Sequence, residues 1–271
     1  MYGKDLIDSA RLSGQIVQLL GRRPPVGFSY ELFLDEEGRK ISKSVGKGLT
    51  VKAWTQYAPL ESLLYYIYQN PHRARRLYWD VVPRCVDDYL QALRRYPRVP
   101  EVERPEQDVW HVGDRGVRVP AYAAQVDFTM VNNLIAALGT DSAELLVDYL
   151  ERYDPQALEC HEVTRSLVEK GLNYYRDFVL PGKTYRRPDE REIGLLQRLR
   201  DLLAVADPAD EESLQALPFD LARENGLEPK ELFRIFYEVV LGQERGPRFG
   251  SFVRLIGRDR ALAMLDERLL Q

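Results

Sequence analysis

The sequence predicts a mainly α-helical protein with more than one domain, and three observations carry this prediction. Apolar residues recur at helical spacing almost throughout the chain after residue 50. The aromatic-rich alternation and glycine-bearing turn that are typical of strands occur only within the first fifty residues. A polar, proline-rich interval at 97–120 interrupts the helical pattern, as a domain boundary does. We therefore expect a short β-hairpin and loop followed by helical domains.

Composition excludes several classes of protein. The 271 residues include 38 basic and 42 acidic side chains, a net charge of −4, so the chain is no general polycation. It has no apolar run of the roughly 18 residues that span a membrane, and no signal-peptide pattern. Cys85 and Cys160 stand far apart, and the three histidines form no HExxH motif. We expect a cytoplasmic protein with no membrane partner and no structural metal.

The first fifty residues contain the only mixed pattern. Residues 5–20 carry apolar side chains at loose helical spacing, and Gly21 with two following prolines ends the helix. The alternating segment 28–34 is followed by a turn containing Gly38 and by residues 39–42, which predicts a hairpin. A glycine-bearing loop at 43–50 completes this region.

Helical segments account for most of the remaining chain. Residues 59–70 and 74–95 each carry a core-facing apolar stripe at helical spacing. Further helices are expected near 122–138, 142–152, 158–179, 188–205, 210–225, 229–241 and 257–270.

The pentapeptide Lys40-Ile41-Ser42-Lys43-Ser44 is the sharpest chemical signal. Two ammonium groups and two hydroxyls in a loop with Gly46 and Gly48 can clamp and release the oxygens of a polyphosphate. Cations at a departing pyrophosphate stabilise the transition state more than the ground state. The alternative interpretation is a solvated Lys/Ser turn after a hairpin. For the full pentapeptide, a chance match has a probability well under about 1%.

The segment around this pentapeptide, residues 27–44, resembles the signature-loop region of class I lysyl-tRNA synthetases. The resemblance continues through segments 48–50, 57–63, 68–71, 75–83, 86–90 and 241–252. It implies that 1–50 is the C-terminal end of a Rossmann-like catalytic domain. It also implies that 51–100 is a connecting helical domain that contacts the tRNA stem and that 120–271 is a helical anticodon-binding domain.

The sequence departs from this family at several positions. Val45-Gly46-Lys47 stands where the family usually has Lys-Gly-Asn, and the chain has no HIGH-type motif. Residues 1–5 resemble a segment late in the Rossmann-like domain, near the nucleotide ribose, and Leu6 stands where the family commonly has His. The sequence therefore resembles the C-terminal half of a synthetase, beginning at an internal methionine and lacking the N-terminal half with the HIGH motif.

The resemblance implies an activity and a set of site residues. The family is a lysine–tRNA ligase that activates lysine with ATP and transfers it to tRNA. Its partners are therefore tRNA, ATP and lysine, and Mg²⁺ is expected with ATP. Lys40 and Lys43 would be catalytic, and the ATP-binding residues would be Lys40, Ser42, Lys43, Ser44, Gly3 and Asp5.

Two basic regions are candidates for tRNA contact. The first lies between residues 73 and 98, where arginines outnumber aspartates, and the second is the glycine-rich segment 242–252. The candidate residues are Arg73, Arg75, Arg76, Arg245 and Arg248. The alternatives are a solvated helix face for the first region and a connector between two helices for the second.

Two other functions remain open. A non-catalytic tRNA-binding module or fragment would also have these features, and without the HIGH-containing half the isolated chain is expected to be inactive. A glutamyl-type synthetase relative is a weaker alternative that the segment 246–270 would also suit.

Overall fold

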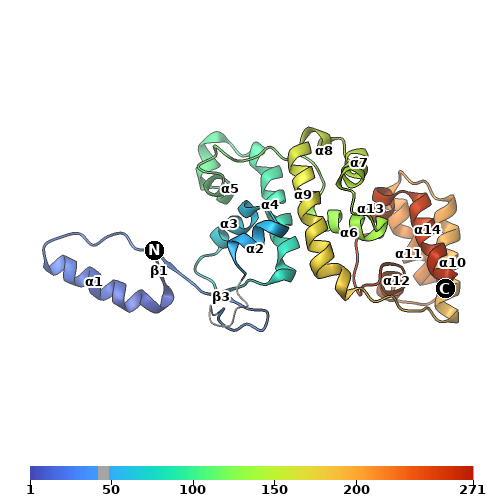
Figure 1. Ribbon diagram of the computed structural model, residues 1–271, viewed down its shortest axis with the longest axis horizontal. Helices are drawn as coiled ribbons and strands as arrows, with labels where there is room; N and C mark the ends of the chain where they lie inside the picture. The colour runs from blue at the N-terminus through green and yellow to red at the C-terminus, as the bar shows by residue number, and fades with distance from the viewer. Residues whose placement is uncertain (42–48, 271) are drawn as a thin grey trace. The chain divides into compact units, whose positions relative to one another are not determined.

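The computed structural model describes residues 1–41 and 49–270, which fold as two compact units. Unit 1 runs from Met1 to Ala121 and unit 2 from Tyr122 to the C-terminus; both are traced by colour in Figure 1. Helices dominate both units and strands are few and short, so the prediction of a mainly α protein is confirmed. Within the described residues, no helix is long and apolar enough to cross a membrane.

Unit 1 begins with a β-α-β arrangement. Strand β1 (Tyr2–Gly3) leads through the 3-10 helix η1 (Lys4–Leu6) into α1 (Ile7–Leu19), and the chain returns as β2 (Ser29–Tyr30). Strands β1 and β2 pair in parallel, with Tyr2 opposite Ser29. No side chain within 1–41 is buried, so this segment contributes nothing to the core of unit 1.

The predicted hairpin is largely replaced by parallel pairing. Strand β3 (Phe33–Leu34) pairs with β4 (Arg75–Arg76), and the antiparallel contact is reduced to one bridge between Leu34 and Lys40. A turn with Gly38 at φ +82° still reverses the chain, and the Asp35 carboxylate accepts the Arg39 amide at 2.7 Å. The local pattern indicated the turn correctly, but the strand partners lie far away in the sequence.

Three helices form the core of unit 1: α2 (Val51–Tyr57), α3 (Leu60–Gln69) and α4 (Val82–Arg95). Trp54 of α2 is fully buried, and its Nε1 donates to the Pro59 carbonyl at 3.1 Å and to Ser62 Oγ at 3.2 Å. The interval at 97–120 contains short helices that the sequence did not indicate. The short helices of unit 1 are η3 (Trp79–Val81), η4 (Tyr96–Arg98), η5 (Glu101–Glu106) and α5 (Asp108–Val112).

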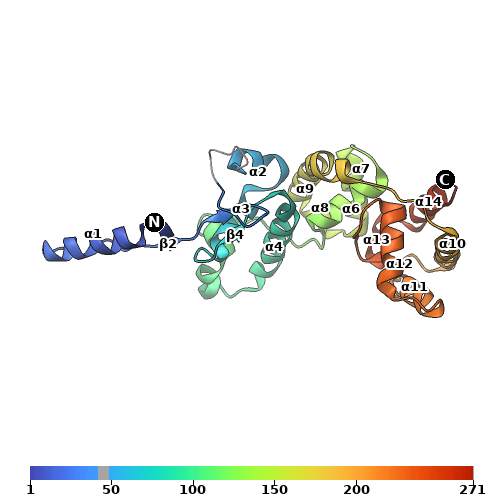
Figure 2. The same ribbon diagram turned by 90° about the horizontal axis from the view of Figure 1, so that it is seen from below.

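Unit 2 is built from helices throughout its described residues. They are α6 (Phe128–Leu138), α7 (Ala143–Tyr153), α8 (Gln156–Glu159), α9 (His161–Tyr174), η6 (Tyr175–Val179), η7 (Leu180–Gly182), α10 (Glu190–Val205), α11 (Glu211–Glu224), α12 (Pro229–Phe236), η8 (Tyr237–Leu241), α13 (Phe249–Ile256) and α14 (Arg258–Leu269). Helix α11 packs against α13, and α10 packs against α14 (Figure 2).

Local capping explains where two predicted helices begin. The carboxylate of Asp127 accepts the Met130 amide at 2.6 Å, so α6 begins at Phe128, and residues 122–127 are extended instead of helical. Asp189 and Glu192 form a reciprocal capping box that starts α10. The Glu192 carboxylate also holds Arg186, at 2.6 Å, and the same guanidinium pairs with Glu238 at 2.8 Å.

Two features of unit 2 depart from regular α-helices. The segments η6 and η8 are π-helical turns that continue α9 and α12. Helix α13 was not predicted, because glycines surround its start. A Cβ at Gly250 would collide with the carbonyl oxygen of Glu211, so glycine permits the close contact between α13 and α11.

Candidate functional site

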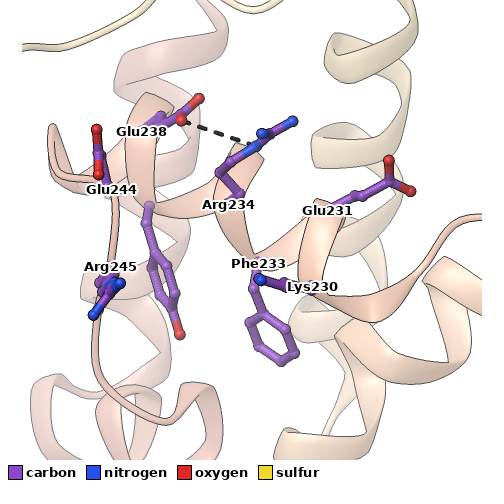
Figure 3. A pocket seen from close by; sticks show the side chains of 9 residues that line it. Lys230, Glu231, Phe233, Arg234, Glu238, Glu244 and Arg245 are labelled. Atoms are coloured by element: carbon purple, nitrogen blue, oxygen red, sulfur yellow. Dashed lines mark ion pairs between the residues drawn. The ribbon is translucent and has the colours of Figure 1, made fainter.

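A large pocket lies in unit 2, between α12, η8 and the loop that follows η8 (Figure 3). Its volume is about 880 Å³. The lining residues are Lys230, Glu231, Phe233, Arg234, Tyr237, Glu238, Glu244, Arg245 and Gly246. We call it the α12 pocket.

Two aromatic rings form one wall of the α12 pocket. Phe233 and Tyr237 lie one helical turn apart, and their ring centroids are 6.0 Å apart with an interplanar angle of 26°. Both side chains are half-buried, so each ring offers part of its surface to the pocket. Figure 3 shows Phe233 and Arg245 on the two sides of this wall.

The Tyr237 hydroxyl fixes the opposite wall. It donates to the carbonyl oxygen of Pro247 at 2.6 Å, and burial raises the pKa of Tyr237, so the hydroxyl remains protonated near neutral pH. The loop backbone packs directly on the ring: a Cβ at Gly246 would lie 2.5 Å from its Cδ1 atom. Glycine at 246 therefore allows the loop to close against the tyrosine.

The charges around the α12 pocket are unequally used. Glu238 is held by Arg186 at 2.8 Å and lies 4.0 Å from Arg234, and Glu231 accepts the Glu228 amide at 3.1 Å. Lys230 and Arg245 are exposed and, among the described residues, form no ion pair. The cations that remain available to a ligand are thus at the pocket rim.

Exposed aromatic rings beside unpaired cations are the components of a site for single-stranded nucleic acid. An unstacked base can lie on an aromatic face, and arginine or lysine can contact the adjoining phosphate. The α12 pocket has both components within one helical turn and its following loop.

The predicted nucleotide residues of unit 1 come together in part. Lys40 Nζ lies 3.3 Å from the Asp5 carboxylate, and Gly3 pairs with Tyr30 on the adjoining strand. Lys40 and Asp5 are both exposed, with 61% and 62% of their side-chain surfaces accessible. The other predicted ATP-binding residues, Ser42, Lys43 and Ser44, lie outside the described residues.

A second ion pair lies on the same segment. Lys4 Nζ is 2.8 Å from the Glu31 carboxylate, and this hydrogen bond lowers the pKa of Glu31 and raises the pKa of Lys4. The pair joins η1 to the residue that follows β2.

The predicted tRNA-contacting arginines differ in their surroundings. Arg75 lies over the Tyr66 ring, 3.5 Å from its centroid, and donates to the Tyr66 carbonyl, so it is engaged in packing. Arg73 and Arg76 are exposed in unit 1. In unit 2, Arg245 lines the α12 pocket, whereas Arg248 lines a smaller pocket of about 180 Å³ with Asp127 and Met130.

No group of three metal-ligating side chains gathers among residues 1–41 and 49–270. The single carboxylate near Lys40 is that of Asp5, which is insufficient for a protein-held magnesium site.

Sequence reasoning missed the aromatic part of the α12 pocket. The signal was present, because residues 230–237 place Phe233 and Tyr237 four apart, interleaved with Lys230 and Arg234. Aromatic pairs were interpreted as core elements, and exposure could not be judged from the pattern.

Comparisons with known proteins agree with this arrangement. Residues 1–115 match the family model "tRNA synthetases class I (K)", and residues 142–269 match "Anticodon binding domain". The chain thus belongs to the class I tRNA synthetase family, and its second unit carries that family's anticodon-binding domain.

Curated relatives narrow the comparison to one amino acid. The chain is 40% identical to a lysine–tRNA ligase from Roseobacter denitrificans over 271 residues, which is 99% of this chain and 51% of the relative. It is 35% identical to a lysine–tRNA ligase from Rickettsia bellii, with 99% and 52% covered. The chain therefore spans about half the length of these relatives.

A solved structure is also similar along the whole chain. It is a glutamate tRNA ligase from Elizabethkingia meningosepticum in complex with its amino acid, with 14% identity and a TM-score of 0.39. This likeness covers 100% of the present chain and 56% of the other.

Proposed function

We propose that this chain is the signature-loop and tRNA-binding part of a lysine–tRNA ligase. In that reaction the lysine carboxylate attacks the α-phosphorus of ATP and pyrophosphate leaves. The terminal ribose of tRNA then takes the lysyl group and AMP is released. The observation that carries the proposal is the α12 pocket, with stacked rings and unpaired cations inside the segment that matches an anticodon-binding domain.

In this proposal the α12 pocket receives an unpaired base of the anticodon loop. The base lies against the exposed faces of Phe233 and Tyr237, and Arg245 and Lys230 contact the backbone phosphates. Arg73, Arg76 and Arg248 are proposed as further phosphate contacts, because they are exposed. Arg75 has the weakest case, since it already stacks on Tyr66.

The first unit would act on ATP. Lys40 and Lys43 would neutralise charge that develops on the departing pyrophosphate, and Ser42 and Ser44 would donate to its oxygens. Gly3 and Asp5 would lie near the ribose, where a carboxylate can accept hydroxyl hydrogen bonds. Mg²⁺ would arrive bound to the phosphates of ATP. We place this activity in the cytoplasm, where charged tRNA is consumed.

Binding of RNA to the 271-residue chain tests the proposal directly. The probes are an unmodified lysine tRNA transcript and a minihelix that lacks the anticodon loop. Phe233→Ala should weaken binding of the full transcript about 5- to 150-fold, because a stacked base contributes about 1–3 kcal/mol. Arg245→Ala should reduce the slope of log K against log salt by about 1.

Two controls make this result specific. Tyr149→Ala removes another half-buried ring of unit 2, outside the α12 pocket, and should leave binding unchanged. Minihelix binding should not respond to Phe233→Ala. Equal binding of the transcript by the wild type and Phe233→Ala would show that the α12 pocket is not the RNA site.

A tRNA-binding module without ligase activity is the second candidate, favoured by the absence of a HIGH-type motif from the sequence. Lysine-dependent ATP–pyrophosphate exchange separates the two. The ligase proposal predicts no exchange by these 271 residues alone, and exchange after the chain is joined to the half of the Roseobacter denitrificans relative that it does not match. No exchange in either case, with tRNA binding intact, would favour the module.

A further inference from the structure

The segment 1–30 carries apolar surface that nothing in the described chain covers. Exposed large apolar side chains are concentrated there, with Leu12 at 51%, Ile16 at 58%, Leu19 at 87% and Leu20 at 73% accessible. These residues follow the spacing i, i+4, i+7 and i+8, so in α1 and its last turn they form one face. A continuous apolar helix face of this kind is normally packed against another layer.

The opposite face of α1 already has a neighbour. Ala10, Gly14 and Val17 are its half-buried residues, and a Cβ at Gly14 would lie 3.7 Å from the Pro24 side chain in the returning segment. Helix α1 is therefore apolar on two opposite faces, and one of the two is open. Helices with this pattern are found between two layers of protein.

The small sheet beside α1 is open as well. Strands β1 and β2 form a parallel two-stranded sheet, and β1 has no second strand partner among the described residues. On the other side, the chain after β2 is engaged, because the Glu31 amide donates to the Pro71 carbonyl at 2.8 Å. Parallel sheets occur almost only where further strands and helices cover them, so the free edge of β1 is the direction in which this sheet extends.

An apolar pocket adjoins the same sheet. It has a volume of about 460 Å³ and is lined by Met1, Phe28, Tyr30, Glu31, Phe33, Ile67, Tyr68, Asn70, Pro71, Arg73 and Arg75. Met1 precedes β1, while Phe28 and Tyr30 lie on and beside β2, and all three are exposed. The uncovered surface thus continues from the sheet into this pocket.

We propose that the free edge of β1 and the Leu12–Ile16–Leu19–Leu20 face of α1 form one docking surface for a polypeptide layer. Its occupant is the part of a lysine–tRNA ligase that corresponds to the half of the curated relatives lying outside the match. That half supplies a further parallel strand on β1 and an apolar face on α1. The length of the relatives supports this occupant, since 99% of this chain accounts for 51% of the Roseobacter denitrificans protein. The proposal rests on the proposed function for the identity of the occupant.

Amide hydrogen exchange in a fused protein tests the docking surface. The fused ligase joins the unmatched half of the Roseobacter denitrificans relative to the complete 271-residue chain, in the order that the relative has. Amides of residues 2–20 should exchange at least about tenfold more slowly in the fused ligase than in the chain alone, because docking suppresses local opening. The double variant Leu12→Asp with Ile16→Asp should lose most of this protection.

The control is Val102→Asp, which places the same charge on an exposed valine of unit 1, with 86% of its surface accessible, in η5. Its protection at 2–20 should equal that of the unaltered fused ligase. Equal exchange at 2–20 in the fused and unfused proteins would overturn the proposal, as would full protection in the Leu12/Ile16 variant. Either result would leave tRNA binding at the α12 pocket untouched, so failure of this inference is distinguishable from failure of the proposed function.

Discussion

The ammonium group of Lys40 lies 3.3 Å from the carboxylate of Asp5, although 35 positions separate the two residues in sequence. Asp5 belongs to the turn after β1, and Lys40 follows the turn after β3. The pair thus joins two segments that were each expected to contact ATP, and holds the lysine beside the place where the nucleotide ribose would lie. An ATP phosphate would replace the carboxylate as the lysine's partner.

The first prediction concerns this pair in the fused ligase. Lys40→Ala should lower kcat for lysine-dependent ATP–pyrophosphate exchange by up to about 10²–10³-fold, with the KM for lysine nearly unchanged. Asp5→Asn should change kcat far less, because it removes only the partner that the phosphate displaces. A larger loss in Asp5→Asn than in Lys40→Ala would contradict the assigned roles.

Lys43, outside the described residues, is the subject of the second prediction. In the fused ligase, Lys43→Ala should reduce kcat for exchange about 10²–10³-fold, because the cation acts on charge that develops at the pyrophosphate. Lys43→Arg should restore only part of the rate, since a planar guanidinium does not replace a compact ammonium. An increase in the KM for lysine with kcat preserved would exclude a role at the triphosphate.

The third prediction uses the contact between Gly246 and Tyr237. Gly246→Ala places a methyl group 2.5 Å from the ring, so the loop must move, and unfolding in urea should show a loss of about 1–3 kcal/mol. Binding of the tRNA transcript should weaken as well, because Arg245 moves with the loop. Gly194→Ala is the matched control: the added Cβ of this α10 residue meets nothing within 4 Å, so the substitution should stabilise by about 0.5–1 kcal/mol.

The fourth prediction is a pH dependence in unit 2. Hydrogen bonds from Arg186, at 2.6 and 3.0 Å, lower the pKa of Glu192 below its usual 4.5. A carboxyl whose folded pKa is depressed contributes stability above its unfolded pKa, and that contribution is lost as the pH falls through the lower folded value. The wild type should therefore be more stable than Glu192→Gln near pH 7, and the difference should shrink as the pH falls below about 4.5.

Urea titrations of both proteins between pH 7 and pH 3 would measure this difference. The side-chain amide oxygen that Glu192→Gln introduces can still accept the Asp189 amide, so the capping box is kept and the comparison isolates the charge. A difference that is constant over the whole range would show that the Glu192 charge contributes nothing to stability.

Sequence reasoning worked best where structure is local. The helices of 74–95 and 188–205 were expected from apolar spacing, and the structure has α4 and α10 there. The hairpin at 28–42 was mostly wrong, because β2 and β3 pair with Tyr2–Gly3 and Arg75–Arg76, and no local pattern reports such remote partners.

The sites divide in the same way. Lys40 and Arg245 were identified from motif and charge, and the first lies against Asp5 while the second lines the α12 pocket. Phe233 and Tyr237 were missed, because ring exposure depends on the loop at 244–247 folding back over α12. Arg75 looked like a free cation in the sequence, yet it lies over Tyr66.

The π-helical turn η8 constrains how this protein can vary. A π turn contains one residue more than the α-helical turn it replaces. Deleting one residue there would restore regular helix and rotate the following chain by about 100° relative to α12. Tyr237 would then no longer reach the Pro247 carbonyl, and Arg245 would leave the pocket rim. Insertions and deletions should therefore be excluded from 237–247 among proteins that keep this pocket, while the exposed turn at 206–210 should accept them freely.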